Sequence, residues 1–182
     1  MRIVDIFAEV SDYRGQMFSV TYPSSDGSYD KCEYSKLLDL WTNVEYLRNY
    51  AIENNKQDIN GFVNQRLRDA EKIEDLIEEI LENREPLDRY FHQLDNNETG
   101  FKTLSLRKGK TSRKDSLRIY AVKIDTNCFL ITGGAIKMSL KNEDHPDTRR
   151  EMKKIQQVRS YLQSEGIIDE DSFYELLIEL EQ

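Results

Sequence analysis

The spacing of apolar residues divides the first half of the chain into strands followed by helices. Residues 3–10 and 17–22 are rich in Ile, Val and Phe, which predicts a hairpin or two short strands. Apolar residues then recur every three or four positions over 34–53 and again up to about residue 83. This period is typical of amphipathic helices that bury one side, so two long helices are expected.

Polar residues and proline mark where the second of these helices begins and ends. Asp58 or Asn60 is the predicted cap, because a side-chain oxygen there can accept from the first unpaired backbone N–H groups. Pro86 cannot continue the helix, since it lacks the N–H that the helical ladder needs. Residues 87–94 are expected to add one or two further helical turns.

After the polar segment 95–100 the apolar period changes from 3.6 residues to two, which predicts strands. The expected strands are 101–106, 117–124 and 128–132. A tight turn at 125–127 favours an antiparallel meander, and the basic stretch 107–114 is predicted to form a loop. Gly133 and Gly134 are expected to bend or bulge the chain before a further extended segment.

The C-terminal residues return to a helical pattern. Pro146 precedes a predicted helix over 149–163, Gly166 ends it, and a last acidic helix extends to Glu181. The candidate capping residues are Asp147 or Thr148 for the first of these helices and Asp169 or Asp171 for the second.

These elements together predict an α+β fold, with two N-terminal helices packed on a small antiparallel β-sheet and additional C-terminal helices. The length of 182 residues suits one domain. We expect residues 1–142 to form the α+β domain with an N-terminal extension, and residues 143–182 to form a C-terminal helical segment packed on the same domain.

Charge is segregated along the chain. The net charge is −8, yet residues 101–141 contain ten basic residues and only two acidic ones, so this segment carries +8 and the rest of the chain −16. Because salt screens charges beyond about 8 Å, a phosphate-rich partner would respond to this segment and not to the acidic total. The alternative is a solvated basic loop that the acidic helices of the same molecule balance.

Several classes of function lack support in the sequence. No run of 18 apolar residues is present, and Asp5 and Glu9 interrupt the start where a signal peptide needs an apolar core, so a cytoplasmic protein is expected. Cys32 and Cys128 lie 96 positions apart without metal-ligand spacing and are predicted to be reduced thiols. A phosphate-binding loop would need glycine where Leu104 stands, and GxSxG and HExxH are absent, so no metal or other cofactor is expected.

The predicted strand LRIYAVKI at 117–124 contains the strongest candidate chemistry. Alternation places Arg118 and Tyr120 on one face, about 7 Å apart. A guanidinium can hold two phosphate oxygens, and a phenol can exchange a proton or stack on a base. The structural alternative is an arginine whose stem lies along the core beside a core tyrosine.

One part of the chain resembles the core of the RelE/ParE toxin superfamily, particularly its HigB-like, phage-derived members. It reads GFKTLSLRKGKTSRKDSLRIYAVKIDTNCFLITGGAIKMSLKN, follows two predicted helices and precedes HPDTRREMKKIQQVRSYL. Those proteins share an arginine-bearing strand, a turn, an apolar strand, a glycine or histidine step and a lysine-containing segment. The resemblance covers roughly residues 73–162, and Met138 stands where relatives often have a second lysine.

The resemblance implies a RelE-like fold and a toxin of a toxin–antitoxin system. Ribosome-dependent members of the superfamily cut mRNA in the A site without metal, so mRNA on the ribosome and a cognate antitoxin are the expected partners. Arg118 falls on the arginine of the family strand and Lys137 on the first lysine of the segment after it. On charge and placement alone, we add Tyr120 to this catalytic set. The candidate RNA-binding residues, added on the same grounds, are Arg107, Lys108, Lys110, Arg113 and Lys114.

Two other interpretations stay open. The same fold could bind a protein partner such as gyrase or an antitoxin without cutting RNA. Alternatively, the acidic C-terminal helices could fold over the basic segment and neutralise it. All the RNA hypotheses require the basic face of the sheet to remain open to a polynucleotide strand.

Overall fold

A computed structural model describes residues 1–7, 17–83, 86–94, 104–110, 117–138 and 144–181. Its strands are β1 (Arg2–Asp5), β2 (Met17–Thr21), β3 (Phe91–Gln93), β4 (Ser105–Lys110), β5 (Leu117–Asp125) and β6 (Cys128–Ile136). Its α-helices are α1 (Glu33–Thr42), α2 (Val44–Glu53), α3 (Ile59–Glu82), α4 (Pro146–Ser164) and α5 (Glu170–Glu181), with a short 3₁₀ helix η1 (Leu87–Arg89). No helix in these described ranges is long and apolar enough to cross a membrane.

The six strands form one mixed sheet in the order β1-β2-β6-β5-β4-β3. Strands β3 to β6 form an antiparallel meander, of which the period-two pattern predicts β4, β5 and β6 but not β3. The N-terminal hairpin β1–β2 extends the same sheet, because β2 pairs in parallel with β6. The α+β class is therefore confirmed, although the sheet is mixed and the chain starts with strands and not with helices.

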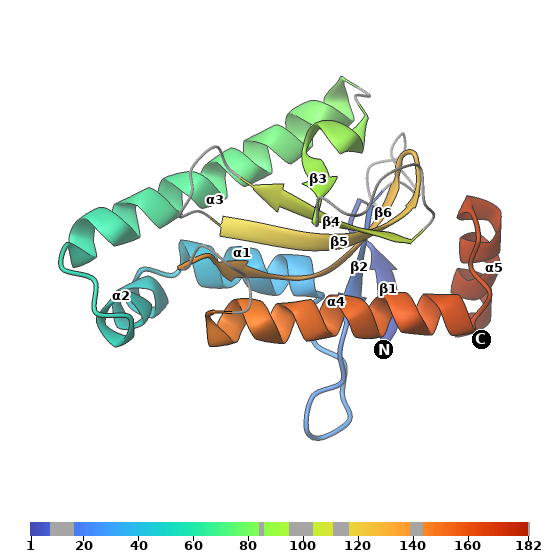
Figure 1. The fold of residues 1–182 in the computed structure, drawn as a ribbon, viewed down its shortest axis with the longest axis horizontal. Coiled ribbons are helices and arrows are strands. Elements are labelled where there is room, and N and C mark those ends of the chain that lie inside the picture. The colour runs from blue at the N-terminus through green and yellow to red at the C-terminus, as the bar shows by residue number, and fades with distance from the viewer. Residues whose placement is uncertain (8–16, 84–85, 95–103, 111–116, 139–143, 182) are drawn as a thin grey trace.

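Helices cover both faces of the sheet, and Figure 1 shows α3 and α4 flanking it on opposite sides. One face carries a core to which Trp41 of α1, Ile73 of α3 and Phe129 of β6 contribute. The other face carries a core to which Ile155 of α4 and Phe173 of α5 contribute. Two separate apolar layers thus hold the C-terminal helices and the N-terminal helices on opposite sides of one sheet.

The long helix predicted over 34–53 is interrupted in the structure. Asn43 adopts an extended conformation, and its side chain accepts a hydrogen bond from the backbone N–H of Tyr46 at 2.9 Å. Asparagine is among the best N-caps, so it ends α1 and starts α2 although the apolar period continues across it. Three helices therefore precede the meander, not two.

Two predictions around the meander are wrong in part. Residues 87–94 contain one helical turn, the 3₁₀ helix η1, but the rest of the segment is not helical, because Phe91–Gln93 pairs with β4 as strand β3. The segment 107–114 is not a loop over its first part, since residues 107–110 belong to β4. Positions 111–116 of the predicted loop lie outside the described residues.

Two of the predicted helix caps are confirmed and one is not. Asp58 caps α3 by accepting from Gly61 N–H at 2.8 Å, and Asp169 caps α5 by accepting from Ser172 N–H at 2.9 Å. At α4 the cap is His145 and not Asp147 or Thr148, because the helix starts three residues earlier than predicted, with Pro146 in its first turn. Both cysteines are free, as predicted, and both are buried.

Candidate functional site

Helix α4 presents two stripes of polar side chains on its two sides. Positions 147, 150, 151 and 154 follow the spacing i, i+3, i+4, i+7, and so do positions 149, 152, 153 and 156. The first stripe lines a pocket shared with α1, α2 and the end of β6, and the second lines an open groove. The stripes lie on opposite sides of α4 because successive residues are rotated by about 100°.

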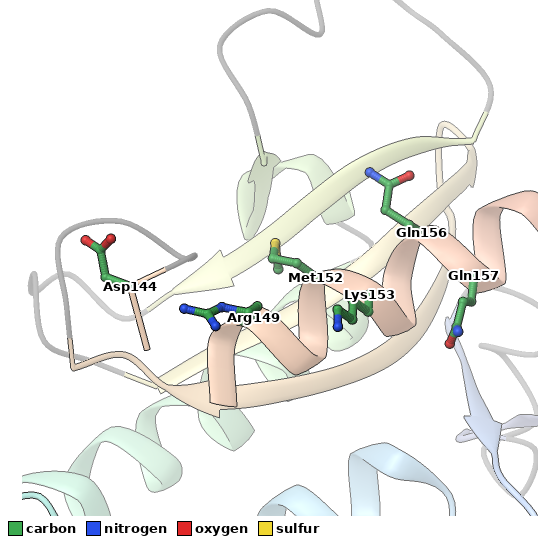
Figure 2. A pocket seen from close by; sticks show the side chains of 6 residues that line it. All are labelled: Asp144, Arg149, Met152, Lys153, Gln156 and Gln157. Carbon is green, nitrogen blue, oxygen red and sulfur yellow. The ribbon is translucent and has the colours of Figure 1, made fainter. Parts of the chain in front are cut away.

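The open groove, here called the basic groove, has a volume of about 720 Å³. Its described lining residues are Asp144, Arg149, Met152, Lys153, Gln156 and Gln157. Figure 2 shows Arg149, Met152 and Gln156 on α4 in front of the strands of the sheet. All of its described lining residues come from α4 or from Asp144 just before it, and α4 itself packs on β6 and β5, so the groove runs along α4 beside the sheet.

The sheet register places part of the predicted site on this same face. Lys108 of β4 stands opposite Tyr120 of β5, and Lys110 stands opposite Arg118. Tyr120 belongs to the core beneath α4, which identifies the face. The prediction that Arg118 and Tyr120 share a face therefore agrees with the register and with the core.

Arg118 and Tyr120 are both covered by the rest of the molecule, so the sheet face that the RNA hypotheses require to be open is closed at these two residues. Only 6% of Arg118 is exposed, and one of its guanidinium nitrogens donates to the Leu117 carbonyl at 3.4 Å. Tyr120 is 0% exposed, and its hydroxyl has no hydrogen-bond partner in the described part of the chain. Burial raises the pKa of Tyr120, so the phenol stays protonated at neutral pH.

Other basic residues of the segment point to the opposite face of the sheet. Arg107 and Lys123 are buried there, and both approach Asp88, at 3.8 Å and 2.5 Å. The guanidinium of Arg107 also donates to the Ser105 hydroxyl at 3.1 Å. The segment that carries +8 is thus divided between two faces, and strand alternation is the reason.

The remaining predicted residues lie at one end of the sheet or outside the described ranges. Lys137 is half-buried and follows β6 directly. Lys108 is half-buried, and its ammonium donates to the Leu94 carbonyl at 3.0 Å. Arg113 and Lys114 lie outside the described residues. Among the described residues, no group of three or more His, Cys, Asp or Glu side chains could hold a metal ion.

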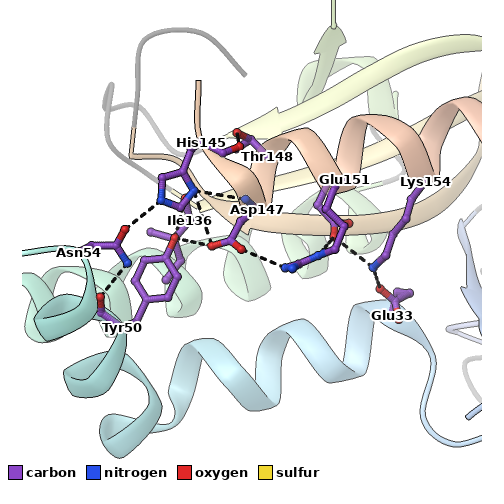
Figure 3. Close-up of polar contacts among 10 residues, drawn as sticks. Glu33, Tyr50, Asn54, Ile136, His145, Asp147, Thr148, Glu151 and Lys154 are labelled. Carbon is purple, nitrogen blue, oxygen red and sulfur yellow. Dashed lines mark hydrogen bonds and ion pairs between the residues drawn. The ribbon is translucent and has the colours of Figure 1, made fainter. Parts of the chain in front are cut away.

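On the other side of α4, the pocket encloses a network of charged side chains that sequence reasoning missed. We call it the Glu151 pocket; its volume is about 190 Å³, and its charged lining residues are Glu33, Lys36, Asp147, Arg150, Glu151 and Lys154. Lys154 lies between two carboxylates, 2.9 Å from Glu33 Oε2 and 3.1 Å from Glu151 Oε1. Figure 3 shows Glu151 and Lys154 reaching from α4 toward Glu33 of α1.

A second set of hydrogen bonds joins the start of α4 to α2. The Tyr50 hydroxyl donates to Asp147 Oδ2 at 2.8 Å, and His145 Nε2 lies 2.9 Å from Asn54 Oδ1 (Figure 3). His145 also accepts from the backbone N–H of Asp147 as the helix cap. These contacts hold the first turn of α4 against α2.

The double glycine of β6 allows this close packing. A Cβ atom at Gly133 would collide with Glu151 Oε2. A Cβ atom at Gly134 would lie 2.5 Å from the Arg118 carbonyl oxygen, 2.7 Å from Leu37 and 3.0 Å from Trp41. The expected bulge is also present, since the register with β5 shifts between Gly133 and Ile131. Together with the i, i+3, i+4 charges of α4, these glycines are the sequence signal that could have indicated the pocket.

No family model matches the chain, and neither a curated protein nor a solved structure matches it.

Proposed function

We propose that this protein binds single-stranded RNA in the basic groove, as a toxin of the RelE/ParE type that acts on mRNA at the ribosome. The observation that supports this proposal is the position of the groove. Arg149 and Lys153 line it, and α4, which carries them, covers the sheet face that holds Lys108 and Arg118. Cations along an open groove are what a phosphate backbone requires.

The resemblance to metal-independent endoribonucleases assigns roles within this proposal. RNA cleavage without metal needs a deprotonated ribose 2′-OH, a neutralised phosphate and a protonated leaving oxygen. Arg118 and Lys137 supply positive charge for the scissile phosphate, and Arg149 and Lys153 hold the backbone beside it. Tyr120 supports the sheet core and not the proton transfer, because its side chain is buried beneath α4. The proton transfer falls to a lysine of the basic segment.

Binding without cleavage is the second candidate, and the burial of Arg118 and Tyr120 favours it. A guanidinium that is 6% exposed reaches a phosphate only if its surroundings move. In this version the groove docks RNA, or the fold acts through a partner such as gyrase or an antitoxin, and no bond is broken.

Binding is tested with two double variants of equal charge and spacing. Arg149→Ala with Lys153→Ala removes two groove cations, and Arg68→Ala with Lys72→Ala removes two exposed cations from α3 on the other face. We expect the groove variant to bind a labelled single-stranded uridine oligonucleotide at least tenfold more weakly. The slope of log affinity against log salt concentration should become shallower by about 0.7 for each phosphate contact that is lost. The α3 variant should keep both the affinity and this slope of the wild-type protein. Equal losses in both variants would contradict the groove assignment.

Cleavage is tested separately by mapping mRNA 5′ ends after adding the protein to translating ribosomes. The toxin proposal predicts new ends at A-site codons in the presence of a chelator, and their loss in the groove variant and in Lys137→Ala. RNA binding without new ends selects the second candidate. Absence of both RNA binding and new ends contradicts both candidates.

A further inference from the structure

The Glu151 pocket contains a buried acceptor without a donor. Glu151 is 3% exposed, and its Oε1 atom is paired with Lys154. Its Oε2 atom has no hydrogen-bond partner among the described residues. A buried carboxylate oxygen that stays unpaired costs free energy, so a donor that reaches this oxygen is stabilised there.

The charges of the pocket are arranged by depth. The side chains of Glu151 and Glu33 are 4% and 11% exposed, whereas those of Arg150 and Lys36 are 64% and 32% exposed. Water screens the exposed cations at the rim, but it screens the buried carboxylates at the floor much less. The ammonium of Lys154, whose side chain is 27% exposed, lies between the two floor carboxylates. The floor therefore holds two negative charges and one positive charge, and it favours a further cation or a hydrogen-bond donor.

The walls of the pocket are apolar. Leu37, Leu40 and Trp41 of α1 line it, and Leu40 is among the exposed large hydrophobic residues of the described chain. A volume of about 190 Å³ holds a short alkyl chain and one polar head. The pocket thus combines an apolar wall with an acidic floor.

We propose that the Glu151 pocket binds a primary ammonium group on a short alkyl chain, with the ammonium donating to Glu151 Oε2 beside Glu33. The alkyl chain lies along Leu40 and Trp41. This ligand is either a free amine or a lysine side chain of a partner protein. The proposal does not depend on RNA binding, because the basic groove lies on the other side of α4.

Trp41 provides a local reporter, since it lines the pocket and is the single tryptophan of the chain. Titration with n-butylamine should change its fluorescence saturably, whereas n-butanol, which has the same shape without the charge, should bind at least tenfold more weakly. Equal responses to the two probes would overturn the proposal, because they would indicate apolar contact alone.

Glu151→Gln keeps the shape of the side chain and removes its charge. We expect it to weaken n-butylamine binding at least tenfold, while Glu165→Gln at the exposed C-terminal end of the same helix leaves binding unchanged. Circular dichroism checks that both variants keep their helices. Unchanged binding in folded Glu151→Gln would overturn the assignment.

The wild-type protein offers a test that needs no variant. Burial raises the pKa of Glu151 above its ordinary value of 4.5, and lowering the pH through that raised pKa protonates the carboxylate. The groups that face it are Glu33 from α1, Lys154 and Arg150 from α4, and the tyrosines Tyr22 and Tyr120. Affinity for n-butylamine should therefore fall as the pH is lowered, and an increase would overturn the proposal.

The two sources of the ammonium group are distinguished with a second probe. N-acetyl-lysine methylamide carries the same head and stem on a peptide backbone. Binding equal to or tighter than that of n-butylamine supports the proposal with a partner's lysine as ligand. Binding of n-butylamine alone supports it with a free amine as ligand.

Discussion

The two sides of α4 are built from the same residue types with opposite results. On the side of the Glu151 pocket, the ammonium of Lys154 is enclosed between two carboxylates, 2.9 Å from Glu33 and 3.1 Å from Glu151. On the side of the basic groove, Lys153 is exposed and lines an open cavity. Of two adjacent lysines, Lys154 thus packs between carboxylates and Lys153 remains accessible to solvent. The charge of a segment therefore indicates neither its exposure nor its role.

The largest effect is expected where α1 meets β6 beside the Glu151 pocket. Gly134→Ala introduces a Cβ atom against the Arg118 carbonyl and two core side chains, so it should lower the free energy of unfolding by about 3 kcal/mol. Gly27→Ala is the control, because its Cβ meets nothing within 4 Å and only its positive φ of 80° costs about 1 kcal/mol. Urea denaturation measures both. Equal losses would show that close packing at Gly134 does not matter.

The two lysines are compared directly by the same substitution. Lys154→Met leaves two carboxylates facing each other without their common cation, and we expect a loss of about 2 kcal/mol in unfolding free energy. Lys153→Met changes an exposed side chain and should stay within about 0.5 kcal/mol of wild type. Thermal and urea unfolding provide the measurement. A larger loss of unfolding free energy in Lys153→Met than in Lys154→Met would contradict the expectation that the enclosed lysine contributes more to stability.

A smaller effect is expected at the first turn of α4. His145→Ala removes the helix cap and the contact with Asn54, which should cost about 1 kcal/mol. His145→Asn supplies another good capping side chain and should recover most of the loss. If both variants unfold at the same urea concentration as wild type, the cap contributes nothing to stability.

The smallest effect is a dependence on pH. The raised pKa of Glu151 means that the folded protein binds a proton more readily than the unfolded chain. This preferential protonation of the folded state adds to the free energy of unfolding. The contribution is fully present below the ordinary pKa of 4.5 and is lost as the pH rises through the raised pKa. Glu151→Gln lacks this dependence, so its stability relative to wild type should increase with pH over that window. Parallel stability curves for the two proteins would show that the carboxyl does not titrate differently on folding.

Periodicity predicted the parts of the fold that depend on local sequence. The period-two pattern of LRIYAVKI placed Tyr120 and Ile119 on opposite faces, and the two cores confirm this alternation. Asp58 and Asp169 were recognisable as caps for the same reason, because a cap satisfies backbone groups only a few residues away. The break at Asn43 was also readable in principle, but the apolar period runs across it.

The candidate site was less accessible to sequence reasoning. Arg107 and Arg118 belong to one basic segment, yet they lie on opposite faces of the sheet. Arg107 of β4 pairs with Ala121, which belongs to one core, whereas Arg118 shares its face with Tyr120, which belongs to the other core. The Glu151 pocket joins Glu33 to residues more than a hundred positions later, and no local pattern connects them. The parallel pairing of β2 with β6 was equally hidden, since the partners are distant in sequence.

The sequence by itself determined most of the helices and strands, the caps at Asp58 and Asp169 and the position of the excess positive charge, because each depends on residues close together along the chain. Only the tertiary structure decided which charges are exposed. Burial depends on which elements cover a face, and here α4 encloses Glu151 and Lys154 on one side while leaving Arg149 and Lys153 beside an open groove on the other.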